Sequence, residues 1–88
     1  MASYSVGMTR SSERELRKIH KSHIPGILKK IKSLSGNPRP SGLILLRSEN
    51  RYYRVRQGDY RIVYEVDDAS KAVTIVKIGH RREVYSDL

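Results

Sequence analysis

The sequence has 88 residues and no cysteine, so we expect one domain, without disulfides or thiolate metal sites. Its longest apolar run is four residues, which excludes a membrane span, and we expect a cytoplasmic protein with no membrane partner. The 18 Lys and Arg against nine Asp and Glu give a formal net charge of +9. A small domain with this excess attracts polyanions, nucleic acid first among them, although a basic solvated surface would show the same charge.

The N-terminal half predicts a strand and two helices. Residues 3–8 alternate polar and apolar side chains, which is typical of a half-buried strand. The first helix would be capped by Thr9 or by Ser12, because Ser12–Glu15 has the pattern of a capping box. Apolar residues at helical spacing mark a second helix over 24–34, which the Gly and Pro residues of 36–40 end.

The C-terminal half changes to a period of two and predicts three strands. They cover about 43–56, with a break near 48–50, then 60–67 and 72–79. The last strand is apolar on nearly both faces, which favours a central position in the sheet. The fold class is therefore α+β: an N-terminal strand, a two-helix hairpin and an antiparallel three-stranded meander, with the helices packed on one sheet face.

Strand parity gathers arginines around the first turn of the meander. If residues 57–58 form a two-residue loop, Arg54 opposes Arg61; if the loop is 58–59, Arg56 opposes Arg61. Either register puts all three arginines on one face, whereas a three-residue turn would send Arg61 to the other. Opposed like charges cost up to about 1 kcal/mol. A phosphate ligand would offset this cost; the alternative is a solvated face whose arginines splay apart.

A short basic tail follows the last strand and adds candidate chemistry. His80 has an imidazole suited to proton transfer near neutral pH, Arg81 and Arg82 add positive charge for phosphate, and Tyr85 has a ring that could stack on a base. We expect these residues beside the arginine face if the chain turns over it. A surface histidine and a core tyrosine are the alternatives.

Four segments together resemble the RelE/ParE toxin superfamily, and its RelE branch most. They are Asn-Pro-Arg-Pro at 37–40, Tyr-Arg-Val-Arg at 53–56, Gly-Asp-Tyr-Arg-Ile-Val-Tyr-Glu at 58–65 and Ile-Gly-His-Arg-Arg-Glu-Val-Tyr at 78–85. No single segment is diagnostic, but the set covers essentially the whole chain.

The resemblance implies a single RelE-like domain over residues 1–88 that acts as the toxin of a type II toxin–antitoxin pair. Such a toxin is a ribosome-dependent endoribonuclease that cleaves mRNA in the ribosomal A site. The RNA 2′-hydroxyl attacks the adjacent phosphate, so no metal or cofactor is needed. The family's site positions correspond here to Arg54, Arg56, Arg61, Arg81 and Tyr85. The first three would clamp the scissile phosphate, Arg81 would assist the leaving oxygen, and Tyr85 would orient the nucleotide.

The general base stays open, because the two strand positions that are often lysine in the family are arginine here. We expect His80 in this role, then Tyr85, then a ribosomal group. The implied partners are a cognate antitoxin that folds onto the toxin and a ribosome with mRNA in its A site. We expect a monomeric free toxin and an oligomeric complex. The alternatives are a ParE-like DNA gyrase poison of the same fold and a non-catalytic nucleic-acid-binding module.

Overall fold

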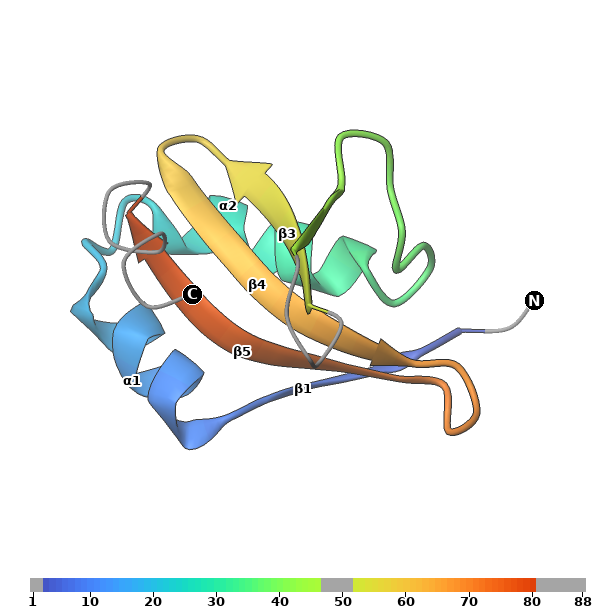
Figure 1. The fold of residues 1–88 in the computed structure, drawn as a ribbon. Helices are drawn as coiled ribbons and strands as arrows, with labels where there is room; N and C mark the ends of the chain where they lie inside the picture. The colour runs from blue at the N-terminus through green and yellow to red at the C-terminus, as the bar shows by residue number, and fades with distance from the viewer. Residues whose placement is uncertain (1–2, 47–51, 81–88) are drawn as a thin grey trace.

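The computed structural model describes residues 3–46 and 52–80, which form two helices and one five-stranded sheet (Figure 1). In chain order the elements are β1 (Ser5–Met8), α1 (Arg10–Lys18), α2 (Ile24–Ser33), β2 (Ile44–Leu46), β3 (Tyr52–Gln57), β4 (Tyr60–Asp67) and β5 (Ala72–His80). The strand order is β1-β5-β4-β3-β2. β1 runs parallel to β5, and the other neighbours are antiparallel.

The predicted α+β class is confirmed, with one more strand in the sheet than the sequence indicated. The stretch expected as one strand over 43–56 contains β2 and β3, and the break predicted near 48–50 falls in 47–51, outside the described residues. β5 lies between β1 and β4, as its apolar character predicted. No helix in the described part of the chain has the length and apolar character needed to cross a membrane.

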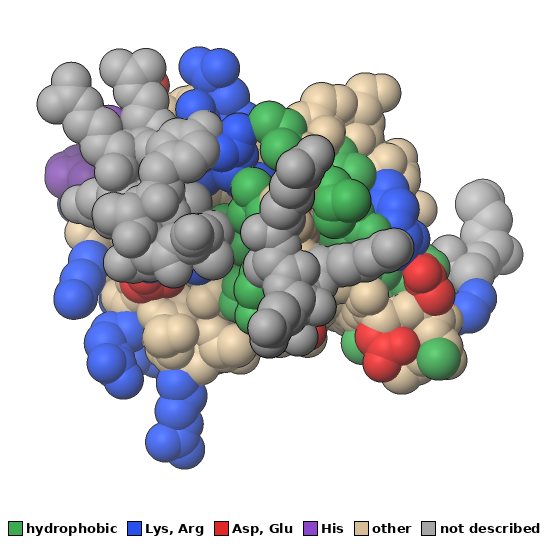
Figure 2. Space-filling view, in the orientation of Figure 1, with side chains coloured by type: hydrophobic (Ala, Val, Ile, Leu, Met, Phe, Trp, Pro, Cys, Tyr) green, Lys and Arg blue, Asp and Glu red, His purple; other side chains and the backbone are tan. Residues whose placement is uncertain are grey.

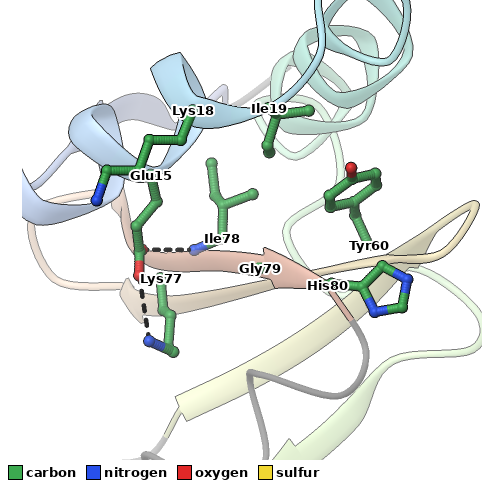
Figure 3. Close-up of a pocket in the computed structure, with 8 residues that line it drawn as sticks. All are labelled: Glu15, Lys18, Ile19, Tyr60, Lys77, Ile78, Gly79 and His80. Atoms are coloured by element: carbon green, nitrogen blue, oxygen red, sulfur yellow. Dashed lines mark hydrogen bonds and ion pairs between the residues drawn. The ribbon is translucent and has the colours of Figure 1, made fainter.

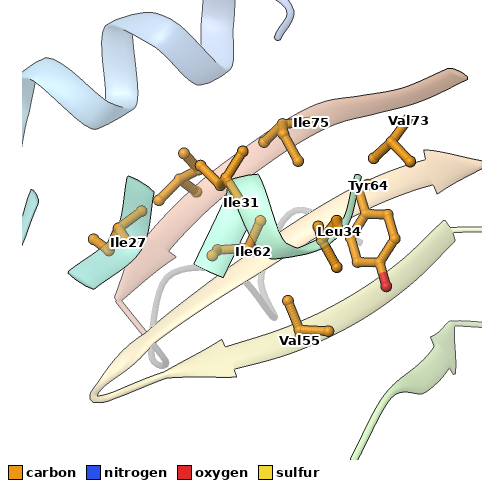
Figure 4. Close-up of a cluster of buried hydrophobic side chains, with 9 residues drawn as sticks. Ile27, Ile31, Leu34, Val55, Ile62, Tyr64, Val73 and Ile75 are labelled. Carbon is orange, nitrogen blue, oxygen red and sulfur yellow. The ribbon is translucent and has the colours of Figure 1, made fainter. Parts of the chain in front are cut away.

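The core lies between α2 and the sheet. Ile27 and Ile31 of α2, and Leu34 directly after it, are buried against one sheet face (Figure 4). Their partners are six strand residues: Val55, Ile62, Tyr64, Val73, Ile75 and Ile78. In the described part of the chain, no helix covers the opposite face of the sheet.

The first helix is capped by Thr9, one of the two predicted caps, whose hydroxyl accepts from the Ser12 backbone N–H at 3.2 Å. The capping box at Ser12 and Glu15 is a wrong prediction. Ser12 is fully buried inside α1, where its hydroxyl oxygen lies 2.9 Å from the Ile75 carbonyl oxygen. Glu15 reaches β5 instead, and accepts from the Ile78 backbone N–H at 3.0 Å.

The position of Glu15 follows from the length of β1. β1 ends where Met8 pairs with Ile75, so no strand of the described ranges 3–46 and 52–80 pairs with β5 on that side beyond Ile75. Backbone N–H groups left unpaired in a folded structure are costly, and the Glu15 carboxylate supplies the missing acceptor. Lys77, which pairs with Glu15 at 3.1 Å, balances the charge. Thus α1 completes the edge of β5 that β1 leaves open.

The linker between α2 and β2 is braced by polar contacts. The buried Tyr64 phenol donates to the Pro38 carbonyl at 2.7 Å, and burial raises the pKa of Tyr64 to about 12. Arg39 makes a two-pronged ion pair with Asp68, with N–O distances of 3.1 and 2.9 Å. Together with a hydrogen bond from the Tyr4 hydroxyl, Arg39 holds the pKa of Asp68 below its usual range. The Asn-Pro-Arg-Pro segment is therefore a structural brace.

Candidate functional site

The turn between β3 and β4 sets the register of the site. Gln57 pairs with Tyr60, so Gly58 and Asp59 form a two-residue turn. Gly58 has φ +60°, a left-handed conformation that favours glycine. Arg56 is thereby placed directly opposite Arg61, as the second of the two predicted registers required.

All three arginines share the sheet face opposite α2, which confirms the geometric prediction. Arg54 and Arg56 alternate along β3 with Val55, which points into the core, and Arg61 precedes the buried Ile62. Figure 2 views this face and shows Lys and Arg side chains gathered where β3 and β4 join. The face therefore concentrates positive charge at one end of the sheet.

Next to Arg61, the neighbouring strand β5 carries a glycine and therefore no side chain. On the β5 side, Arg61 pairs with Gly79, so one row across the sheet reads Arg56, Arg61, Gly79. No side chain competes with Arg61 for space at that position of β5. Glycine within a strand often marks a close approach of ligand to backbone. Gly79 was not predicted as a site residue, because only the pairing of β5 with β4 brings it next to Arg61.

The Arg61 guanidinium is incompletely satisfied. Its Nη1 atom is buried and makes no hydrogen bond within the described part of the chain. A buried donor without an acceptor costs about 1–3 kcal/mol. Arg56 is held differently: its Nε donates to the Gly58 carbonyl at 3.1 Å, which leaves its terminal N–H groups for a ligand. Two opposed guanidiniums of this kind are suited to an anion with several oxygens, such as a phosphodiester.

The neighbouring row carries a further cation that the sequence analysis did not single out. Arg54 pairs with Val63, and Val63 with Lys77. Lys77 lies two residues before Gly79 on the same strand, and this spacing was the available signal. Its ammonium is already paired with Glu15 at 3.1 Å, so it adds less net charge than the arginines.

The predicted tail residues have different outcomes. β5 extends to His80, which pairs with Tyr60. Successive strand residues face opposite sides, so His80 lies on the helix side of the sheet, away from Arg61. The expected position of His80 beside the arginines is therefore wrong. Arg81, Arg82 and Tyr85 lie outside the described residues.

Comparison with known proteins gives the class of protein that carries this fold and this arginine row. A family model described as the ParE toxin of the type II toxin–antitoxin system, parDE, matches residues 6–85. The chain therefore belongs to the ParE toxin family, within the RelE/ParE superfamily.

Relatives place it in the RelE-like branch of that superfamily. It is similar to toxin RelG of Mycobacterium tuberculosis, with 29% identity over 83 residues, covering 93% of this chain and 95% of RelG. The archaeal RelE–RelB complex from Pyrococcus horikoshii matches at 28% identity and a TM-score of 0.79, covering 94% of this chain and 99% of the other. The toxin–antitoxin complex RelBE2 of M. tuberculosis also gives 28% and 0.79, with coverages of 90% and 99%.

Proposed function

We propose that this toxin is a ribosome-dependent endoribonuclease that cleaves mRNA in the ribosomal A site. The observation that carries the proposal is the opposed pair Arg56 and Arg61, with Arg54 on the same face and a buried Arg61 N–H lacking an acceptor among the described residues. The similarity to proteins named RelE and RelG supports this branch of the superfamily.

The arginines would act on the charge of the reacting phosphate. When the 2′-hydroxyl attacks, negative charge builds on the phosphate oxygens, and fixed donors stabilise that charge more than the ground state. Arg61 suits this role because its guanidinium is partly enclosed, where electrostatic interactions are stronger than in water. Arg54 and Arg56 lie about 6.8 Å apart along β3. They can therefore bind different oxygens of one strand and align it for in-line attack.

Proton transfer needs a group other than these arginines, because a guanidinium does not give up its proton at physiological pH. His80 lies on the other sheet face, so we assign it no part in proton transfer. Tyr85 follows as the next predicted base, and Arg81 stays the predicted donor to the leaving oxygen. A ribosomal group is the remaining candidate for the base.

A cognate antitoxin is the proposed protein partner. The toxins of P. horikoshii and M. tuberculosis were solved with their antitoxins, and this chain aligns with each over nine-tenths or more of its length. With a net charge of +9, the toxin favours a partner segment rich in acidic residues. We propose that the free toxin is monomeric and that the complex is larger.

Primer extension on mRNA translated by purified ribosomes tests the proposal. We expect cleavage by the unmodified toxin and a loss of roughly 100- to 1000-fold in Arg61→Ala, the size expected for removing one transition-state donor. Arg17→Ala on α1 is the matched control and should cleave normally. Intact mRNA together with inhibited DNA gyrase would overturn the proposal in favour of the gyrase poison. Cleavage by folded Arg61→Ala at the normal rate would remove the arginine row from the mechanism.

A further inference from the structure

A cleft of about 380 Å³ lies at the edge of β5, beside α1. Gly79 and His80 both line it, although adjacent strand residues point to opposite sides of a sheet. The cleft therefore joins the two faces around the edge that β1 leaves open. Because Gly79 also ends the row of Arg56 and Arg61, the cleft adjoins the arginine site.

Aromatic rings form one end of this cleft. The rings of Tyr60 and His80 lie 5.9 Å apart, nearly perpendicular at 83°. The His23 ring packs on Tyr60 from the helix side, with 5.3 Å between ring centroids, and holds it in place. Figure 3 shows Ile19 and Ile78 between these rings and the Glu15–Lys77 pair at the opposite end. Flat rings over an aliphatic surface are suited to a nucleobase.

The charges in the cleft favour an anionic ligand. Glu15, the one carboxylate among the described residues that line it, already accepts from Lys77 and from the Ile78 backbone N–H. Lys18, in the last turn of α1, is exposed and also lines the cleft. An ammonium near an aromatic pair matches the phosphate and base of one nucleotide, whereas an acidic or purely apolar lining would not.

We infer that this cleft binds one unpaired RNA nucleotide, with its base against Tyr60 and His80 and its phosphate at Lys18. The inference rests on the proposed function for the source of the RNA. A strand bound by Arg61 can round the edge of β5 at Gly79 and place a neighbouring nucleotide in the cleft. An unstacked nucleotide of ribosomal RNA also offers a base and a phosphate, so it could occupy the cleft in the same way.

Titration of the free protein with 5′-mononucleotides, followed by amide NMR in the Arg61→Ala background, tests the cleft directly. We expect shifts at Ile19 and Ile78, none with ribose 5-phosphate, and binding weakened roughly 5- to 100-fold in Tyr60→Leu, the loss of one base–aromatic stack. Tyr60→Phe keeps the ring and should bind like the parent. Absence of shifts, or an unchanged dissociation constant in folded Tyr60→Leu, would overturn the inference.

The cation is tested separately, on surface positions that do not endanger folding. Lys18→Glu should weaken nucleotide binding, whereas Lys29→Glu on α2 makes the same charge reversal outside the cleft and should not. If both substitutions weakened nucleotide binding equally, Lys18 would act only through the net charge of the protein, and the inference would be contradicted.

Ultraviolet crosslinking of the unmodified toxin to programmed ribosomes, with the adducts on Tyr60 and His80 identified by mass spectrometry, distinguishes the source of the nucleotide. Crosslinks to labelled mRNA or to ribosomal RNA each support the cleft and name its ligand, and crosslinks to neither contradict it. Failure of the cleft and failure of the proposed function are separable. Nucleotide binding that depends on Tyr60 without mRNA cleavage rejects only the nuclease, and cleavage that depends on Arg61 without such binding rejects only the cleft.

Discussion

Replacing Arg61 by methionine should make the free toxin more stable while abolishing its activity. Arg61 faces Arg56 across the hairpin, and opposed like charges cost up to about 1 kcal/mol. Its buried Nη1 has no acceptor among the described residues, at a cost of about 1–3 kcal/mol. Methionine keeps most of the aliphatic stem, so little packing is lost.

We therefore expect Arg61→Met to raise the free energy of unfolding by about 1–3 kcal/mol, which in a domain of this size is about 4–8 °C in Tm for each kcal/mol. Urea and thermal unfolding of the purified proteins measure the change, with Arg14→Met on the exposed side of α1 as the control. The part due to repulsion should shrink in 1 M salt, where charges are screened within about 3 Å. A variant that is less stable than the parent would refute the reasoning that Arg61 destabilises the free toxin.

Three further changes test other parts of the structure. Glu15→Ala removes the acceptor of the Ile78 N–H and should lower the free energy of unfolding by about 1–3 kcal/mol in urea titrations, whereas Glu13→Ala on the same helix should be near neutral. Burial raises the pKa of Tyr64 from 10.0 to about 12, so the unfolded chain loses this proton first and the free energy of unfolding falls as pH rises between these values. After allowance for screening, the Tyr64 phenol accounts for a fall of about 1–2 kcal/mol in the free energy of unfolding over this pH range. Tyr64→Phe should not show this fall. If the free energies of unfolding of the two proteins changed with pH in parallel, the assignment to Tyr64 would be wrong. His80→Gln should leave the pH profile of the single-turnover cleavage rate unchanged at saturating ribosomes, and loss of an acidic limb would restore His80 as the base.

The sequence predicted the arginine face correctly for a two-residue turn, because strand parity gives the same side in either two-residue register, but it could not exclude the three-residue turn that would have separated Arg61 from the other two arginines. It could not choose between the registers, since residues 57–58 and 58–59 are both compatible with a turn at Gly58. The choice is made by packing, which pairs Gln57 with Tyr60.

The apolar character of β5 has a cause that no local pattern reveals. A register shift between Val63 and Tyr64 places an extra residue in β5, so that Val63 pairs with Lys77 and Tyr64 with Ile75. In β5, the odd-numbered Val73 and Ile75 face the core before the shift, and the even-numbered Ile78 faces it after the shift. The change of parity also places His80 on the helix side, whereas the sequence prediction ended this strand at residue 79 and let the following residues turn over the arginine face.

The capping-box error has a tertiary origin as well. Ser12 and Glu15 have the spacing of a local motif, but both side chains bond to β5, more than sixty residues away in sequence. Their roles depend on β1 being shorter than its neighbour, and helix propensity contains no information on that length.

The shortness of β1 has one more consequence. A strand edge with free amide groups invites pairing with a second molecule, and a carboxylate at that edge discourages such growth. Three additional residues in β1 would extend the pairing to Ile78, and they would fill the space between α1 and β5 in doing so. A relative with a longer first strand would thus have a continuous sheet edge in place of this cleft, so the length of β1 decides which of the two surfaces a toxin of this fold presents beside α1.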